Sequence, residues 1–465
     1  MKNTIDTLDA ISPVDGRYAS KTRKLRAFTS EHALIFYRVL VEVKWFKFLS
    51  AEKGISDLPK FDAQSTDILD SIINTFSKAD SEEIKKLEAT TNHDVKAVEY
   101  FLKALLLKSK NRALVDASEF IHFACTSEDI NNLAYGLMLR DARDKIMIPE
   151  LTTLRDTIVG IAIKYAEVPM LARTHGQVAS PTTMGKEMAV FVSRLHSQLE
   201  ELKKISILGK LNGAVGNYNA HLAAYPNFDW FKASQDFVES LGLEWNPLTT
   251  QIEPHDYIAE LFNALSRINT IVLDLDRDLW SYISIGYFKQ KRIEGETGSS
   301  TMPHKVNPID FENSEGNLGI ANAVLNHLAQ KLPISRWQRD LTDSTVLRNI
   351  GPGLAYSVIA YQATVKGIKK LDLDENRLNE DLFESWEVLA EAIQTIMRMH
   401  GLDQPYEKLK NLTRGEQLNE GSIKRIIEEL DLPDTAKEQI ERLSPKNYVG
   451  DAKRLVDSLI DKLSK

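Results

Sequence analysis

Apolar residues recur along most of this chain at every third or fourth position. The clearest stripes cover residues 188–205, 268–282 and 321–332. This spacing places apolar side chains on one face of an α-helix, and stripes of this length predict long amphipathic helices. Runs of strict apolar–polar alternation, which would predict strands, are scarce. The pattern therefore predicts an all-α protein with a central bundle of long helices.

Polar segments rich in glycine and proline separate the stripes, and they lie at 169–181, 212–219, 225–229 and 295–308. From these breaks we expect three helical domains with soft boundaries. They are an N-terminal domain at 1–110, a central long-helix bundle at 111–353 and a C-terminal domain at 354–465. The sequence Gly351-Pro352-Gly353 ends the central bundle, and the chain after residue 370 is more charged.

Composition and charge narrow the class of protein. The 465 residues are 43% hydrophobic, which is ample for a large buried core, and the net charge is −8. An acidic chain lacks the basic excess needed to bind nucleic acid or an anionic membrane, so we expect neither partner. Cys125 is the only cysteine, which excludes an intrachain disulfide. The chain start lacks an apolar signal-peptide segment and charges interrupt every apolar run, so we expect a cytoplasmic protein.

The segment 298–308 carries the most concentrated chemistry, with the sequence Gly-Ser-Ser-Thr-Met-Pro-His-Lys-Val-Asn-Pro. Gly295 and Gly298 allow a mobile loop. Asn307 is predicted to cap a helix that has Pro308 at its first position, so the neighbouring Lys305 would stand beside an anion-attracting helix start. Residue types alone leave two interpretations open, a polar surface loop with a helix cap and a site for carboxylates.

The same segment resembles the signature loop of the fumarase/aspartase superfamily, Gly-Ser-Ser-x-Met-Pro-x-Lys-x-Asn-Pro, at every fixed position. His304 resembles the adenylosuccinate lyase branch, whereas argininosuccinate lyase usually has Gln there and fumarase a small residue. Further similar segments are Thr-His-Gly-Gln at 174–177, Thr-Asn-His-Asp at 91–94, Thr-Ser-Glu-Asp at 126–129, Arg-Trp-Gln-Arg-Asp at 336–340 and Pro-Lys-Asn-Tyr at 445–448. The resemblance spans essentially the whole chain and is greatest to the longer bacterial form.

This resemblance implies a specific activity and assembly. Members of the branch are C–N lyases of purine nucleotide biosynthesis. They eliminate fumarate from adenylosuccinate to give AMP, and from the succinyl-carboxamide ribotide SAICAR to give AICAR. They use no metal and no organic cofactor. They assemble as homotetramers around a core of long helices, with active sites shared between subunits.

The resemblance also assigns catalytic roles. Ser299 would be the general base and His175 the general acid, with Glu312 orienting His175. A serine hydroxyl is a poor base unless its oxyanion is stabilised, so we expect loop closure over bound substrate to supply that environment. Lys305 would support this charge, and Ser300, Lys305 and Asn307 would hold the succinyl carboxylates.

Substrate-binding residues are carried over in the same way. Arg17, Tyr18, Arg339, Ser344 and Arg348 correspond to contacts of the nucleotide phosphate, a task suited to the bidentate arginine side chain. His93 is also a candidate second acid/base group. The remaining expected substrate contacts are Asn92, His93, Asp94, Thr126, Ser127, Gln251, Val306, Asn313 and Thr345. Without the resemblance, an isolated Arg17 or Gln251 would be interpreted as a surface polar group.

Other chemistries have less support in the sequence. The chain contains no His-Glu-x-x-His zinc motif, no Gly-x-x-x-x-Gly-Lys-Ser/Thr phosphate loop and no Gly-x-Ser-x-Gly hydrolase motif. A sister lyase of the superfamily is the first alternative, and His304 together with the arginine set argues against it. A structural protein that keeps the fold without catalysis, as lens crystallins related to argininosuccinate lyase do, is the second. The joint presence of Ser299, His175, Lys305 and Glu312 disfavours it.

Overall fold

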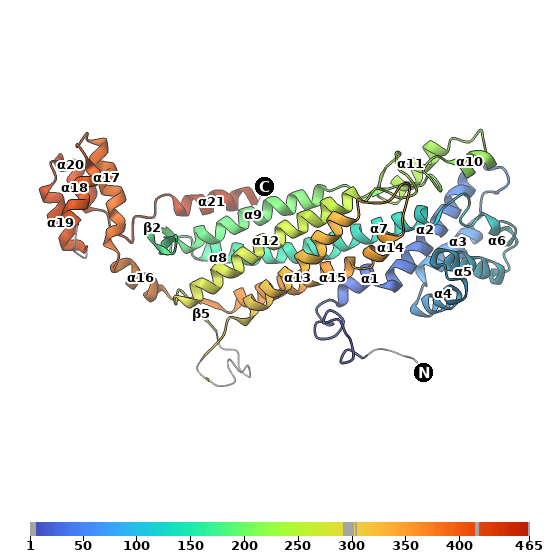
Figure 1. Cartoon of the computed structure of the whole chain (residues 1–465), viewed down its shortest axis with the longest axis horizontal. Coiled ribbons are helices and arrows are strands. Elements are labelled where there is room, and N and C mark those ends of the chain that lie inside the picture. Colours follow the sequence, from blue (N-terminus) through green and yellow to red (C-terminus); the bar gives the residue numbers. More distant parts are fainter. Residues whose placement is uncertain (1–5, 292–301, 303–304, 414–417, 464–465) are drawn as a thin grey trace. The chain divides into compact units, whose positions relative to one another are not determined.

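A computed structural model describes residues 6–291, 302, 305–413 and 418–463, and helices dominate it (Figure 1). The all-α prediction is confirmed. The α-helices are α1 Arg26–Thr29, α2 Glu31–Ala51, α3 Ala63–Asn74, α4 Lys78–Thr91, α5 Asp94–Ser109, α6 Arg112–Asp116, α7 Ser127–Ala142, α8 Ile148–Lys164, α9 Met184–Lys204, α10 Asn219–Ala224, α11 Trp230–Ser240, α12 Asp256–Ser284, α13 Ile309–Lys331, α14 Thr342–Leu347, α15 Ile350–Lys369, α16 Glu375–Phe383, α17 Ala390–Met399, α18 Pro405–Thr413, α19 Glu420–Glu429, α20 Asp434–Glu441 and α21 Ala452–Leu463.

Short strands and tight helical turns complete the described chain. Strands β1 (Pro169–Thr174) and β2 (Gln177–Thr183) form an antiparallel hairpin, β3 (Leu208–Gly209) pairs in parallel with β4 (Glu244–Trp245), and β5 (Phe288–Gln290) pairs antiparallel with β6 (Leu371–Leu373). The 3-10 turns are η1 Arg23–Leu25, η2 Ser118–Phe120 and η4 Trp386–Leu389, and η3 (Arg143–Met147) is a π-helical turn. The hairpin occupies the break expected at 169–181, where no strand was predicted.

The predicted stripes are the buried faces of the longest helices. Met188, Leu195 and Leu199 are buried on α9, and Leu275 and Leu279 are fully buried on α12. The stripe at 321–332 lies on α13. Burial of such a face, rather than helix propensity, supplies most of the stability of a helix in a folded protein. None of the helices in the described ranges is long and apolar enough to cross a membrane.

The chain folds into two compact units, each made of segments distant in sequence. Unit 1 comprises 1–151, 198–270 and 316–360, and unit 2 comprises 152–197, 271–315 and 361–465. Helices α8, α9, α12, α13 and α15 each contribute residues to both units. The division into three consecutive domains stays a prediction.

Unit 1 has an aromatic and aliphatic core around α2. This helix packs against α5 and α7, and its Trp45 lies against Phe237 with ring centroids 4.9 Å apart. Two ionisable side chains of α2 are also buried, Arg38 and Glu42. Glu42 contacts His122 Nδ1 at 2.6 Å. Buried charges are costly unless they are paired, so α2 must be matched by polar groups on its neighbours.

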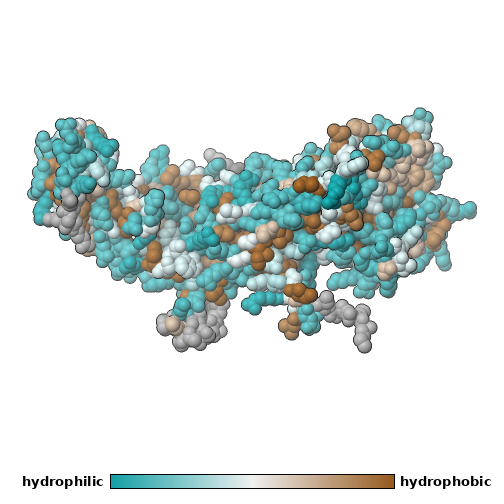
Figure 2. Space-filling view, in the orientation of Figure 1, coloured by the Kyte–Doolittle hydropathy of each residue, from teal (hydrophilic) through white to brown (hydrophobic). Residues whose placement is uncertain are grey.

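Unit 2 contains a second apolar cluster, formed by the short helices α17–α20 around Leu389, Ile393, Met397, Ile427 and Ile440. Elsewhere in the unit, α12, α13 and α15 enclose a buried carboxyl group. Thr364 Oγ1 lies 2.9 Å from Asp276 Oδ1 and 2.8 Å from Ser314 Oγ. Burial raises the pKa of Asp276 to about 8, so the carboxyl is protonated at neutral pH. The face of the molecule in Figure 2 is mostly hydrophilic, with scattered apolar residues.

Candidate active site

Arg339 lies at the centre of the best-defined group of predicted substrate residues, in unit 1. Its Nη1 donates to Gln251 Oε1 at 3.2 Å, and its Nη2 lies 2.9 Å from Glu128 Oε1. Gln251 is fixed in turn, since its Nε2 donates to the carbonyl oxygen of Ala214 at 2.9 Å. The structure thus brings together Arg339 and Gln251, two residues that are 88 positions apart.

A cavity of about 280 Å³ opens beside this pair, lined in part by Gln251 and Arg339. Trp337 also lines it, and its side chain is 91% exposed with a left-handed backbone φ of 54°. Such a conformation is uncommon for a bulky residue, and it turns the indole outward beside Arg339. An arginine with an open cavity next to it can receive a phosphate.

Three residues, Glu128, Asn131 and Arg38, connect the group around Arg339 to a second group. None of the three was predicted as a site residue, although Glu128 lies in the Thr-Ser-Glu-Asp segment at 126–129. Asn131 Nδ2 donates to Glu128 Oε1 at 2.8 Å, and Asn131 Oδ1 accepts from Arg38 Nε at 2.8 Å. Arg38 Nη2 then donates to Asp94 Oδ2 at 2.6 Å. For Arg38, the sequence did contain a signal of an unusual role: a charged residue in the middle of the apolar run Leu-Ile-Phe-Tyr-Arg-Val-Leu-Val at 34–41.

Asn92, His93 and Asp94 form the junction between α4 and α5. Asn92 ends α4 in the left-handed conformation, which asparagine tolerates well, and His93 caps α5 by accepting the Lys96 backbone N–H on Nδ1 at 3.1 Å. Because Nδ1 accepts, the ring proton of neutral His93 is on Nε2. His93 is exposed, so this Nε2–H is available to a ligand.

Asp94 is the charged end of this junction. Burial acts to raise its pKa, but the charge of Arg38, hydrogen bonds from the Val95 N–H and from Arg38, and the charge of Arg348 together hold the pKa of Asp94 below its usual value. Arg348 Nη2 lies 3.6 Å from Asp94 Oδ2, and Arg348 Nη1 donates to Glu31 Oε2 at 2.9 Å. Two predicted substrate residues, Asp94 and Arg348, therefore meet here.

Thr126 and Ser127 stand at the start of α7, where Thr126 is the N-cap of a capping box. Asp129 Oδ2 accepts the Thr126 backbone N–H at 2.8 Å. The same carboxylate forms a fully buried ion pair with Lys210 at 2.9 Å and accepts the backbone N–H of Asn212 at 3.0 Å. A buried ion pair therefore fixes the position of the two hydroxyl residues.

The other predicted residues of unit 1 are more exposed. Arg17 is exposed, with its guanidinium 6.0 Å from the Tyr18 ring centroid. Ser344 and Thr345 lie on the short helix α14, where Ser344 is half-buried and Thr345 exposed. The joint contact of Arg17 and Arg339 with a phosphate stays a prediction.

His175 lies in unit 2, at the tip of the β1–β2 hairpin. His175 and Gly176 form a two-residue loop between the paired residues Thr174 and Gln177, and both have positive φ, 54° and 76°. This is the geometry of a type I′ turn, which suits the right-handed twist of the strands. His175 is exposed at this tip.

Arg173 ties the hairpin to the rest of unit 2. Its Nη1 donates to the Tyr287 hydroxyl oxygen at 2.8 Å, and its Nη2 lies 3.3 Å from Asp381 Oδ2. Tyr287 donates to the same carboxylate oxygen at 2.9 Å, and Arg377 pairs with Asp381 Oδ1 at 2.6 Å. The orientation of the hairpin is thus set by a network two residues from His175.

The described part of the signature segment precedes α13. Lys305 is exposed, Val306 and Asn307 are half-buried, and the Val306 carbonyl oxygen accepts from Gln290 Nε2 at 3.0 Å. Ser299, Ser300 and His304 lie outside the described residues, and so do Gly295 and Gly298. The helix begins at Ile309, one residue later than predicted, and the Pro308 carbonyl accepts the backbone N–H groups of Phe311 at 3.1 Å and Glu312 at 3.4 Å.

Glu312 and Asn313 follow in the first turns of α13. The Glu312 carboxylate is exposed and accepts from Trp280 Nε1 at 3.2 Å. No hydrogen bond or ion pair links Glu312 to His175 in the part of unit 2 that the structure describes. Their predicted pairing stays a prediction, and in a single chain the Glu312 side chain is oriented by Trp280. Asn313 is half-buried.

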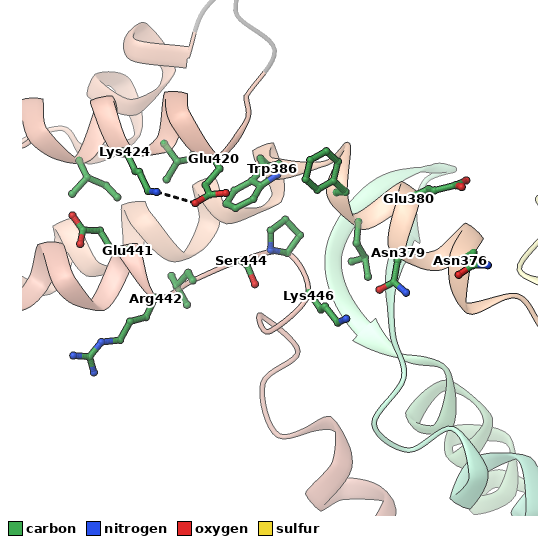
Figure 3. A pocket seen from close by; sticks show the side chains of 16 residues that line it. Asn376, Asn379, Glu380, Trp386, Glu420, Lys424, Glu441, Arg442, Ser444 and Lys446 are labelled. Atoms are coloured by element: carbon green, nitrogen blue, oxygen red, sulfur yellow. Dashed lines mark hydrogen bonds and ion pairs between the residues drawn. The ribbon is translucent and has the colours of Figure 1, made fainter.

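A separate cavity of about 840 Å³ in unit 2 contains none of the predicted residues. Figure 3 shows Trp386, Ser444 and Lys446 around it, with Lys424 paired to Glu420 at 2.8 Å. Cations and carboxylates are equally represented on its wall, with Lys424, Arg442 and Lys446 against Glu380, Glu420 and Glu441. Size alone does not make this cavity a candidate active site, because it lacks the group of converging site residues found around Arg339.

Comparison with known proteins identifies the family. A model described as "Lyase" matches residues 16–324, and one described as "Adenylosuccinate lyase C-terminal" matches residues 335–449. An adenylosuccinate lyase of Haemophilus influenzae is 58% identical over 456 residues, covering 98% of this chain and 99% of that protein. The chain belongs to the adenylosuccinate lyase family. The enzyme of Escherichia coli K12 is 56% identical over 455 residues, with the same coverage of both chains.

Solved structures support the fold over nearly the whole chain. A fumarate lyase from Mesorhizobium sp. BNC1 superposes with a TM-score of 0.76 at 18% identity, covering 94% of this chain and 97% of that one. A 3-carboxy-cis,cis-muconate lactonizing enzyme from Pseudomonas putida gives a TM-score of 0.74 at 20% identity, covering 95% and 97%. At these identities the likeness concerns the fold alone. Membership of the adenylosuccinate lyase family, within the fumarase/aspartase superfamily, makes this chain a lyase that releases fumarate.

Proposed function

We propose that this chain eliminates fumarate from adenylosuccinate to give AMP, and from SAICAR to give AICAR, in the cytoplasm. The observation that carries the proposal is 58% identity to an adenylosuccinate lyase along almost the entire length of both chains. The group around Arg339 and its adjoining cavity supports a substrate with a phosphate. Argininosuccinate and malate, the substrates of the sister lyases, have no phosphate for such an arginine to bind.

The reaction breaks one C–H and one C–N bond. Ser299, as an alkoxide, takes the proton from the carbon next to a succinyl carboxylate. The electron pair of that C–H bond becomes the double bond of fumarate. The pair of the C–N bond goes to the purine-side nitrogen, which receives a proton from His175. Fumarate and the nucleotide then leave.

The charge that develops on the substrate must be held by cations and N–H donors. Lys305, Ser300 and Asn307 bind the succinyl carboxylates, and Lys305 stands just before the first turn of α13, where backbone N–H groups favour anions. Glu312 orients His175 once the site is assembled. Arg17, Tyr18, Arg339, Ser344 and Arg348 bind the phosphate, and Thr126, Ser127 and Gln251 bind the rest of the substrate.

Active sites shared between subunits of a homotetramer would explain why the residues proposed for bond cleavage are exposed in the single chain. His175, Lys305 and Glu312 are exposed in the single chain, and so are the apolar side chains of Ile309 and Trp280 beside them. Catalysis needs a site that excludes water, and a single chain does not enclose these residues. Surfaces of other subunits would cover them.

The test is an assay for fumarate. The purified protein is mixed with adenylosuccinate, and fumarate and AMP are quantified, with argininosuccinate and malate as control substrates. We expect equal amounts of fumarate and AMP from adenylosuccinate, and no turnover of the controls. Turnover of argininosuccinate in place of adenylosuccinate would assign the chain to the sister branch. Absence of fumarate from all three would contradict a lyase.

A further inference from the structure

Arg38 is a buried cation for which the proposed function has no role. Its side chain is 2% exposed, on a helix whose buried residues are mostly apolar. It is held by two partners from different elements, Asn131 of α7 at 2.8 Å and Asp94 of α5 at 2.6 Å. A buried arginine that lost either partner would leave donors unsatisfied, so α2 fixes the distance between α7 and the start of α5.

Asn131 is a directional link in this arrangement. Arginine has only donors and an ionised carboxylate has only acceptors. The Asn131 oxygen must therefore face Arg38, and its NH2 group must face Glu128, as the structure has them. Reversing the amide would place two donors together at Arg38 and two acceptors together at Glu128. No other orientation of this side chain satisfies both neighbours.

Glu128 completes the connection to the phosphate-binding group. Its Oε1 accepts from Asn131 at 2.8 Å and lies 2.9 Å from Arg339 Nη2. The side chain is 4% exposed, so its charge depends on these partners. Burial raises the pKa of Glu128, whereas the nearby Arg339 guanidinium acts in the opposite direction. Displacement of Arg339 would leave a buried carboxylate without this cation, which is unfavourable.

The hydrogen-bonded series Arg38–Asn131–Glu128 ends at proposed substrate residues on both sides. Arg339 is held against Gln251 at one end, and Asp94 lies next to His93 and Arg348 at the other. The three residues between the ends, Arg38, Asn131 and Glu128, are buried. They act on substrate only through the residues that they hold.

We propose that Arg38, Asn131 and Glu128 are positioning residues that hold the phosphate-binding Arg339 and the His93–Asp94 helix start in one geometry for a purine-type nucleoside monophosphate. This inference rests on the proposed function. It predicts that Arg339 and the His93–Asp94 helix start are coupled, so that substitution of a buried residue between them weakens nucleotide binding and turnover together. A merely structural network would lower stability and leave both unchanged.

The test compares substitutions at Glu128 with one at a buried asparagine outside the connection. Glu128→Leu removes both contacts, whereas Glu128→Gln keeps an oxygen for Arg339 and Asn131 and removes the charge. Asn269→Leu is the matched control, because Asn269 is buried in the same unit and donates to Asn322 and Ser357. For each variant, the AMP dissociation constant, kcat, KM and thermal unfolding temperature are measured.

We expect Glu128→Leu to weaken AMP binding about tenfold or more and to lower kcat/KM by a similar or larger factor. Glu128→Gln should recover most of both losses, since the hydrogen-bond geometry survives. Asn269→Leu should lower the unfolding temperature and leave AMP affinity within about twofold of wild type. If Glu128→Leu does not fold, Asn131→Leu, which keeps the Glu128–Arg339 pair, takes its place with the same expected direction.

The inference is overturned if Glu128→Leu, or Asn131→Leu in its place, changes AMP affinity no more than the control does. It is also overturned if Glu128→Gln loses as much as Glu128→Leu. Failure of the proposed function is a separate result, because it would appear as absence of fumarate release by the wild-type protein.

Discussion

The two units hold their proposed site residues in opposite ways. In unit 1, Arg339, Asp94 and Gln251 are engaged in buried or half-buried networks before any ligand is present. In unit 2, His175, Lys305 and Glu312 are exposed, on a hairpin tip and beside a helix start. These three residues, proposed to bind the nucleotide, are thus held in place within one chain, whereas the three residues proposed for bond cleavage are exposed on its surface. Preorganisation favours tight binding, and exposed chemical groups need further surfaces to exclude water.

The largest effect on activity is expected at His175, one of the exposed site residues of unit 2. We expect His175→Asn to lower kcat by about 10²–10⁴-fold, because the leaving nitrogen loses its proton donor. Asparagine tolerates the left-handed φ of this position, so the unfolding temperature should stay near wild type. Steady-state kinetics with adenylosuccinate measure the effect, and His400→Asn, at an exposed histidine outside the site, is the control. A variant with near-normal kcat would remove His175 from catalysis.

The next largest effect on activity is expected at Arg339, in the network of unit 1. Arg339→Lys keeps the charge but cannot contact Gln251 and Glu128 from two separate nitrogens as Arg339 does. We expect KM and the AMP dissociation constant to rise about tenfold, with a smaller change in kcat. Titration calorimetry with AMP reports the affinity. Arg194→Lys is the control, because Arg194 forms an exposed ion pair with Asp274, and its KM and AMP dissociation constant should stay near wild type. If Arg339→Lys also leaves both constants near wild type, Arg339 does not bind the phosphate.

A smaller effect is expected at the base of the His175 hairpin. Arg173→Met removes the contacts to Tyr287 and Asp381, so the hairpin tip is held less firmly. We expect kcat to fall about tenfold with little change in AMP affinity. Arg377→Met is the matched control, because Arg377 pairs with the same Asp381, at 2.6 Å. Equal losses in both variants would show that Asp381, rather than the anchoring of the hairpin, matters for kcat.

The smallest effect on activity is expected at Asp276, outside both sites, where the predicted change is in stability. Asp276 has a pKa of about 8 in the folded chain, well above that of an unfolded aspartate. Between about pH 4 and pH 8 the unfolded state therefore binds fewer protons at this group, and its contribution to folding stability decreases as pH rises, by at most about 1.4 kcal/mol per pH unit.

Asp276→Asn removes that titration. Chemical denaturation at pH 6 and pH 8 should show the variant gaining stability relative to wild type as pH rises. A free-energy difference that does not change between these pH values would mean that Asp276 is ionised in the folded protein.

Sequence predicted the helices well because their determinants are local. The stripes at 188–205, 268–282 and 321–332 mark faces that α9, α12 and α13 bury. The β1–β2 hairpin was missed because its loop, His175-Gly176, is not one of the common turn pairs and its strands do not alternate strictly. The class of reaction was predicted from resemblance to a family, since the types and spacing of the residues do not by themselves specify a lyase.

The site was predictable only where a motif marked it. Gln251 was predicted from resemblance, and its contact with Arg339 88 positions away depends on tertiary folding. Arg38, in an apolar run, and Glu128, in the Thr-Ser-Glu-Asp segment, were not predicted as site residues, because neither position indicates which distant residue pairs with its charge. Non-local pairing of this kind is specified by packing of whole helices rather than by local pattern.

The most direct test of the contrast between the two units is to measure AMP affinity and kcat side by side in His175→Asn and Arg339→Lys. The account predicts opposite results, with AMP affinity kept and kcat lost in His175→Asn, and AMP affinity lost with a smaller loss of kcat in Arg339→Lys. Parallel losses of affinity and kcat in both variants would contradict the separation of binding and chemistry between the units.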